Sequence, residues 1–272
     1  LPNGAPADLG ADVTDVLGIK KYDPEAQQEA QLLTKQPQKP QSAIARFLMR
    51  FKWYCKLFMK PKRKGGFPDW IVKTDETRIQ NLTTLFEMER NKGTKFSVTE
   101  KVDGQSATYY LRKVSKRKYE FGVCSRNIYL GTPDNSSYWT IAKKYNIENV
   151  LRQLIGDYET IVLQGEICGN QIQGNKYHIS GYDLFAFNLI YPDHKCGTAE
   201  IKKLLEPYGI KTVPIVEEDK TLPGTIAELV EYSKGKSVVR KEQKREGVVM
   251  RNVQSNISFK VINPDFLLAE KD

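Results

Sequence analysis

The residues best suited to chemistry stand in the short stretch TEKVDGQS, residues 99–106. Lys101 lies at the end of an expected strand and Asp103 follows two positions later, so strand alternation points both side chains into one site. Gly104 then allows the chain to turn sharply. The alternative interpretation of this stretch is a surface ion pair beside a turn.

Three further charged residues interrupt hydrophobic runs that have the length of strands. Glu166 stands in IVLQGEICG, Glu246 in EGVVM and Lys260 in SFKVI. A charge in such a run is costly to bury unless it is paired or used. For each residue, the alternative is an edge position that points to water.

Composition narrows the class of protein. The 272 residues include 42 Lys and Arg against 33 Asp and Glu, and a net charge of +9 favours a polyanionic partner such as nucleic acid or a nucleotide. Four separated cysteines without a C-x-x-C pair argue against a disulfide framework and a zinc site, and they indicate a reducing, intracellular compartment.

Two further sequence signals are absent. GNQIQGNK, residues 169–176, lacks the spacing of a P-loop. The sequence contains no apolar run of the ~18 residues that a membrane span needs.

The elements that must position these residues are short strands mixed with helices. Strands are expected at KFSVTEKV, SATYYLRKV, YEFGVCSR, TIVLQGEI, YDLFAFNLIY, EGVVMRN and ISFKVIN. Helices are expected over residues 74–90, 138–154, 198–205 and 225–233. Because strands and helices do not alternate strictly, the pattern predicts an α+β fold with antiparallel sheets.

The amino-terminal quarter differs in composition from the rest. Residues 1–43 are rich in Pro, Gln, Ala and Lys and are expected to form a linker. Residues 44–66 are expected to form a basic amphipathic helix followed by a hinge. Such a helix suits docking on the main domain, and the alternatives are nucleic acid or a membrane surface. Residues 67–272 would form the main domain.

The order of the charged motifs resembles that of the covalent nucleotidyltransferases, namely the ATP-dependent ligases and the mRNA capping enzymes. The series consists of Lys101–Gly104, Ser125–Arg126, Gly165–Glu166, Phe187 in FAFN, Glu246–Gly247 and Lys260. It covers about residues 70–272. The resemblance implies a nucleotidyltransferase domain, similar to an ATP-grasp fold, in which helices flank antiparallel sheets.

Two features indicate a branch within this superfamily. DNA ligases and capping enzymes usually carry Arg five residues after the nucleophilic lysine, whereas this sequence has Ser106, which favours the nick-sealing branch similar to RNA ligase 2. The upstream stretch FPDWIVKTDETRIQNL resembles RNA ligases of the Deinococcus and Naegleria type. Because those enzymes carry an amino-terminal OB domain, the resemblance implies that such a domain precedes residue 1.

The resemblance also implies roles for the charged residues. Lys101 would attack the α-phosphate of ATP, but a lysine with the ordinary pKa of ~10.4 is neutral in only about one molecule in a thousand at pH 7. Lys260, a divalent metal and partial burial are expected to lower that pKa and to stabilise phosphate charge. Asp103, Glu166 and Glu246 would hold Mg²⁺ or Mn²⁺, directly or through water.

Nucleotide and RNA contacts follow from the same resemblance. Glu100 would accept a hydrogen bond from the adenine amino group, Phe187 would stack on the base, and Glu166 is an alternative partner for the ribose. Core packing is the alternative for Phe187. Arg126, with Ser125, would bind the RNA end or a phosphate, and a solvated strand residue is the alternative for Arg126.

One position departs from the ligase pattern. The last motif usually contains two alternating lysines, but here Lys260 is followed two positions later by Ile262. Arg251 and Lys271 are the candidates to replace the lost cation.

Taken together, these residues predict an ATP-dependent RNA ligase that acts as a monomer. It would join 3′-OH and 5′-phosphate ends, at nicks in duplexes, through a lysyl-AMP intermediate and an adenylylated 5′ end. The alternatives are a capping guanylyltransferase, a DNA ligase, or a non-catalytic nucleic-acid-binding module descended from such an enzyme.

Overall fold

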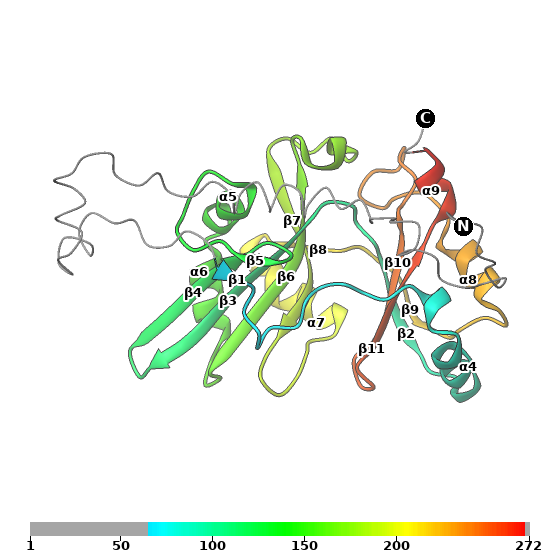
Figure 1. Ribbon diagram of the computed structural model, residues 1–272, viewed down its shortest axis with the longest axis horizontal. Helices are drawn as coiled ribbons and strands as arrows, with labels where there is room; N and C mark the ends of the chain where they lie inside the picture. Colours follow the sequence, from blue (N-terminus) through cyan, green and yellow to red (C-terminus); the bar gives the residue numbers. More distant parts are fainter. Residues whose placement is uncertain (1–64, 270–272) are drawn as a thin grey trace, which may run out of the picture. The chain divides into compact units, whose positions relative to one another are not determined.

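The computed structural model describes residues 65–269, which form two β-sheets with helices packed against them (Figure 1). The expected linker at residues 1–43 lies outside the described residues, as does the expected basic helix and hinge at 44–66 except for its last two glycines. Within the described part, no helix is long and apolar enough to cross a membrane.

The larger sheet has seven strands in the order β1-β5-β4-β3-β6-β7-β8. Neighbouring strands are antiparallel, except that β7 and β8 are parallel. The strands are β1 (Gly65–Gly66), β3 (Gln105–Ser115), β4 (Lys118–Cys124), β5 (Ile128–Tyr129), β6 (Thr160–Gly169), β7 (Tyr182–Ile190) and β8 (Lys211–Thr212). One face of this sheet is covered by α5 (Ser137–Lys144), α6 (Ile147–Leu154) and α7 (Thr198–Leu205).

The smaller sheet has four antiparallel strands in the order β11-β10-β2-β9. These are β2 (Phe96–Glu100), β9 (Ile215–Lys220), β10 (Gly247–Asn252) and β11 (Ile257–Ile262). Its core packs against η1 (Ile79–Asn81), α4 (Thr83–Lys92) and α8 (Ile226–Ser233), through residues such as Phe86 and Leu229. The short helices η2 (Ile172–Asn175) and η3 (Glu206–Tyr208) lie in loops, and α9 (Pro264–Ala269) ends the described chain.

Strand alternation determines which face of the larger sheet is available for a site. On β6, Ile161, Leu163 and Ile167 are buried against the helices on one face. Glu166 therefore points to the opposite face, which carries no such helical layer. The seven strands expected from sequence are all present as β2, β3, β4, β6, β7, β10 and β11, and the antiparallel α+β fold is confirmed.

The helix expected over residues 74–90 is shorter than the pattern suggests, because α4 begins at Thr83. The preceding segment is held in extended form by contacts with both sheets. The Thr74 and Ser106 hydroxyl groups lie 2.6 Å apart, and the Lys260 amide donates to the Thr77 carbonyl at 2.9 Å. These tertiary contacts outweigh the local helix preference.

The helix expected over residues 138–154 is broken into α5 and α6. The break falls at Asn146, which has a φ of 47° and so adopts the left-handed conformation that interrupts a helix. The break lets both short helices bury apolar side chains, including Trp139 and Leu151, against the larger sheet. The helix at 198–205 is confirmed, and α8 begins one residue after the expected Thr225, which instead caps it.

Gly104 is required where the chain leaves the smaller sheet and enters β3. A Cβ atom at this position would lie 2.4 Å from the Ile167 carbonyl oxygen, a backbone atom that cannot rotate away. We expect Gly104→Ala to lower the free energy of unfolding by about 1–3 kcal/mol, measured by urea denaturation. Gly66→Ala is the matched control because its Cβ would meet no atom within 4 Å. Equal stability of the two variants would contradict this account.

Candidate active site

Lys101 is held at the end of β2 by the pairing of β2 with β10. The Lys101 amide donates to the Gly247 carbonyl at 3.0 Å, which continues the antiparallel ladder by one residue. Glu246 directly precedes β10, and the Lys101 Nζ lies 2.7 Å from both of its carboxylate oxygens. The two residues are 145 positions apart in sequence, so only the strand pairing brings them together.

The electrostatics of this pair favour a charged lysine. Burial lowers the pKa of Lys101, but attraction to Glu246, Glu166 and Asp103 outweighs burial and raises that pKa above its ordinary value. Burial and Lys260 by themselves therefore do not produce the lowering that the sequence analysis expects. The reason is that three carboxylates surround Lys101. Burial and the nearby Asp103 also raise the pKa of Glu246, against the opposing effect of Lys101.

Lys260 lies on β11, two strands away from β2. It is paired with Val249 of β10, and its amide is bound by the Thr77 carbonyl. Burial lowers the pKa of Lys260, and repulsion from Lys101 and Arg78 lowers it further. The structure thus brings Lys101 and Lys260 close enough for their charges to interact.

Asp103 is held by two consecutive residues of the loop that follows η2. Its carboxylate lies 2.5 Å from the Lys176 Nζ, and its amide donates to the Tyr177 hydroxyl at 2.9 Å. Glu166 reaches the same site from β6, where it is paired with Ser106. Asp103, Glu166 and Glu246 therefore surround Lys101 from three different elements.

The three carboxylates do not form a compact set of metal ligands. In the described part of the chain, the His, Cys, Asp and Glu atoms that all lie within 4.8 Å of one another are those of His194, Cys196 and Glu200. His194 there contacts Asp193 at 2.6 Å, and Glu200 accepts from the Gly197 amide. The spacing of Asp103, Glu166 and Glu246 suits a hydrated cation held through its waters better than one bound directly by all three.

Glu100 and Phe187, the residues expected to bind a base, differ in their exposure. Glu100 is 1% exposed, its Oε2 accepts from the Val238 amide at 2.7 Å, and its Oε1 has no hydrogen-bond partner among the described residues. Burial raises the pKa of Glu100. Phe187 is half-buried beside Val102, and the Arg251 guanidinium lies 5.6 Å from its ring centroid. An orphaned acceptor suits an amino group such as that of adenine.

Ser125 and Arg126 occupy the turn after β4. Ser125 is 2% exposed, and its hydroxyl accepts from the Ile128 amide at 3.4 Å. Arg126 forms an ion pair with Asp75 at 2.6 Å, which ties the extended segment before α4 to the larger sheet. Ser125 therefore stabilises the turn through its contact with Ile128, whereas the Arg126 guanidinium reaches out of the turn to Asp75.

Arg251, one of the two candidates for the missing cation, is buried on β10. Its side chain is 8% exposed, donates to the Thr99 hydroxyl at 2.9 Å and pairs with Glu76 at 3.5 Å. These partners tie it to β2 and to the segment before α4, and its replacement of the missing lysine stays a prediction. Lys271, the other candidate, lies outside the described residues.

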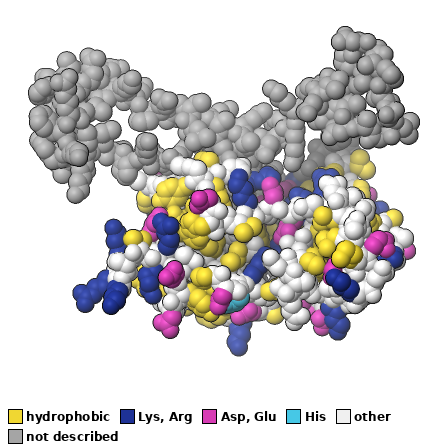
Figure 2. Space-filling view, turned by 60° about the horizontal axis from the view of Figure 1, so that its bottom comes forward, with side chains coloured by type: hydrophobic (Ala, Val, Ile, Leu, Met, Phe, Trp, Pro, Cys, Tyr) yellow, Lys and Arg dark blue, Asp and Glu magenta, His cyan; other side chains and the backbone are white. Residues whose placement is uncertain are grey.

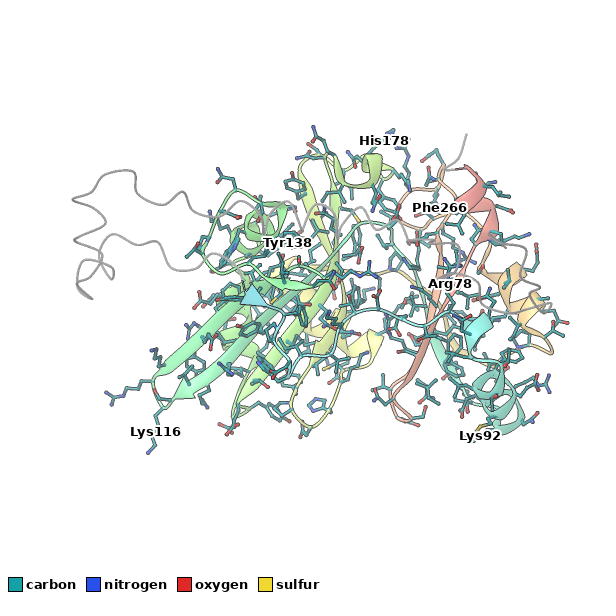
Figure 3. The ribbon with its side chains drawn as sticks, in the orientation of Figure 1. Arg78, Lys92, Lys116, Tyr138, His178 and Phe266 are labelled. Atoms are coloured by element: carbon teal, nitrogen blue, oxygen red, sulfur yellow. The ribbon has the colours of Figure 1, made fainter. Side chains whose placement is uncertain are left out.

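Three site residues were missed by the sequence analysis: Arg78, Lys176 and Tyr177. Arg78 forms a backbone bridge with Lys260, and Figure 3 shows it beside the smaller sheet. The signal for Arg78 was obscured by the helical pattern around it. Lys176 lies in the glycine-containing stretch 169–176, which lacks the spacing of a P-loop. No motif in the sequence therefore indicated that this lysine belongs to the site.

Comparisons with known proteins place the chain in a family. The family described as RNA ligase matches residues 94–262. A search of curated proteins finds no match. Among solved structures, Naegleria gruberi RNA ligase with PPi is 32% identical, with a TM-score of 0.71, and the match covers 97% of this chain and 68% of that one. A variant of the same ligase with ATP and Mn is 30% identical, with a TM-score of 0.72 and coverage of 99% and 70%.

The chain belongs to the RNA ligase family. A third match, a Naegleria gruberi RNA ligase variant with AMP and Mn, is 31% identical, with a TM-score of 0.71 and coverage of 100% of this chain and 70% of that one. The expectations of a nucleotidyltransferase-type RNA ligase and of its fold are confirmed. The expected ATP and divalent metal agree with the ATP, AMP and Mn in the structures of the relatives.

The contact between Lys101 and Glu246 predicts that the pKa of Lys101 depends on the charge of Glu246. Replacing Glu246 with Gln removes the largest attraction on Lys101 while its burial remains, so the pKa of Lys101 falls. We expect the titration midpoint to drop by about 1–3 pH units in an NMR titration of protein with ¹³Cε-labelled lysine. Lys101→Arg assigns the signal, and Glu231→Gln, which removes an exposed surface carboxylate, is the control. An unchanged midpoint in the Glu246 variant would refute the assignment.

Proposed function

We propose that this RNA ligase seals RNA through AMP carried covalently on Lys101. The observation that supports this proposal most directly is the convergence of Lys101, Lys260, Glu166 and Glu246 from strands that are remote in sequence. A lone surface ion pair would not require two lysines to share one partly buried site, because like charges repel there. A nucleotide with its phosphates gives both cations a partner.

In the first step, the neutral Lys101 Nζ attacks the α-phosphorus of ATP. A phosphorus–nitrogen bond forms, the bond from that phosphorus to the bridging oxygen breaks, and pyrophosphate leaves. Lys101 must first lose a proton, and Glu246 is placed to accept it because its oxygens lie 2.7 Å from Nζ. The raised pKa of Glu246 makes that transfer less costly. Lys260 then stabilises charge on the phosphate oxygens.

Asp103, Glu166 and Glu246 are the residues proposed to hold Mg²⁺ or Mn²⁺. Carboxylate oxygens are the donors that these hard cations prefer, and spaced carboxylates suit a cation that retains its water. A bound cation would supply positive charge that offsets the three carboxylates and favours neutral Lys101. The presence of Mn in structures of the Naegleria ligase supports this use of the site.

Glu100 and Phe187 are proposed to bind adenine. The unpartnered Glu100 Oε1 would accept from the exocyclic amino group, while its Oε2 stays bound to the Val238 amide. Phe187 would stack on the base. Guanine presents a carbonyl at the corresponding position, which would place two acceptors against each other, so this contact favours ATP over GTP.

In the later steps, AMP passes from Lys101 to a 5′-phosphate end, and a 3′-OH then attacks that end and releases AMP. The proposed substrate is a nick in a duplex, bound by the protein as a monomer, with Arg126 contacting the end. Figure 2 shows Lys and Arg side chains spread among Asp and Glu on the visible face, and phosphate contacts would be made by individual basic side chains. The family match favours this function over that of a capping enzyme or a DNA ligase.

Self-adenylylation tests the first step. The chain is incubated with ATP labelled at the α-phosphate and Mg²⁺, and the products are run on a denaturing gel. We expect label on the protein, none on Lys101→Ala, and normal labelling of Lys116→Ala, whose lysine lies at the far end of the β3–β4 hairpin (Figure 3). Labelling by GTP instead would indicate a capping enzyme. No labelling by either nucleotide would favour the non-catalytic module.

Nick sealing tests the role of Arg126. A guanidinium that binds a phosphate contributes about 1.5–3 kcal/mol, so Arg126→Ala should slow sealing of a nicked RNA duplex by roughly 10–100-fold. Self-adenylylation of the same variant should change much less. Arg152→Ala removes an exposed arginine that pairs with Glu148 of α6 and lies over the Tyr119 ring, and it serves as the control. Equal losses in both assays would show that Arg126 acts by holding Asp75 and not by binding RNA.

A further inference from the structure

The site lacks a cation where the ligase pattern has one, at position 262. On β11, Phe259 and Val261 are buried in the core of the smaller sheet, so Lys260 and Ile262 share the opposite face. Ile262 is paired with Gly247, directly beside Glu246. The space next to Glu246 at this end of β11 is therefore approached by an apolar side chain and not by a lysine.

Lys176 reaches the same end of β11 from a different sheet. Its Nζ lies 2.5 Å from the Asp103 carboxylate and 4.4 Å from the ring centroid of Phe266, which follows Ile262 by four residues. Its charge also acts on Glu246. Three independent neighbours thus locate the Lys176 ammonium beside the strand end at which the second lysine is missing.

The backbone of the loop that carries Lys176 is held in a left-handed conformation. Gln173, Gly174 and Asn175 have φ values of 46°, 66° and 49°, a left-handed run that non-glycine residues adopt at a cost. Asn175 offsets part of that cost because its side chain bonds both the amide and the carbonyl of Ile179. Figure 3 shows His178 of this loop and Phe266 of α9 at the same end of the two sheets.

We propose that Lys176 supplies the cation that position 262 lacks and binds phosphate oxygens of the bound nucleotide. The inference rests on the proposed function, because it needs a nucleotide phosphate in the Lys101 site. Lysine suits the task, since its long stem lets the ammonium swing from Asp103 to a phosphate while its three donors stay in use. Phe266 stabilises the charge over its ring in the observed position.

A positioning role is the competing account of the same geometry. Lys176 would then only orient Asp103, and its charge would never touch the nucleotide. The two accounts differ in one respect. A cation that binds phosphate can be replaced by a lysine arriving from another strand, whereas a residue that orients Asp103 cannot.

The test measures single-turnover self-adenylylation of the full chain with ATP and Mg²⁺. Lys176→Met keeps the aliphatic stem against Phe266 and removes the charge, and we expect the rate to fall at least about 10-fold. Lys116→Met, an exposed lysine on the β3–β4 hairpin, is the charge-matched control and should keep the rate of the unmodified chain. Adding Ile262→Lys to Lys176→Met should recover at least about three-fold. A Lys176→Met rate within two-fold of the unmodified chain would overturn the proposal.

A second measurement keeps the test decisive if the Ile262→Lys substitution disturbs the buried strand end. Affinity for a fluorescent ATP analogue is compared between Asp103→Asn and the double variant Asp103→Asn, Lys176→Met. A phosphate contact predicts a several-fold weaker affinity in the double variant. Equal affinities would show that Lys176 acts only through Asp103, which overturns the proposal. If the unmodified chain forms no lysyl-AMP, the proposed function fails instead, and the two failures are thereby distinguished.

Discussion

The interaction on which this site depends is the attraction between Lys101 and the acids that surround it, which the proposed function requires the lysine to overcome before it reacts. The Lys101 Nζ lies 2.7 Å from the Glu246 carboxylate and is also attracted by Glu166 and Asp103. The pKa of Lys101 is therefore raised, although burial opposes the rise. Each pKa unit corresponds to about 1.4 kcal/mol between the charged and neutral forms. In the proposed function these carboxylates hold a divalent cation, for which carboxylate oxygens are preferred ligands. The same acids that keep Lys101 charged would thus recruit the metal charge that prepares it for reaction.

The two sheets depend on each other because neither contains the whole site. The smaller sheet carries Lys101, Glu246 and Lys260, while the larger sheet carries Glu166 and the loop with Lys176. Gly104 lets the chain pass between them close to the backbone of β6. The extended segment before α4 then bridges both sheets through its contacts with Ser106, Arg126 and Lys260. Its loss of helical form is therefore part of how the site is assembled.

Sequence reasoning succeeded where a local pattern and the tertiary environment agree. β6 alternates apolar residues with Glu166, and both its existence and the orientation of Glu166 follow from that alternation. It failed where a distant contact decided the outcome. The helical pattern over residues 74–90 did not reveal that Thr77 would bind Lys260. The contacts of Arg251 with Glu76 and Thr99 likewise could not be read from its sequence position.

The sequence by itself determined the family resemblance, the seven main strands and the types of charged residue available to the candidate site, because these depend on residue identity, order and short-range periodicity. Only the tertiary structure decided which charges meet. Lys101 and Glu246 are 145 positions apart, and Lys176 and Asp103 are 73 apart, so their contacts follow from strand pairing and from a left-handed loop. A charge has no partner until the chain folds, and the strength of its interaction depends on the distance and burial that folding sets.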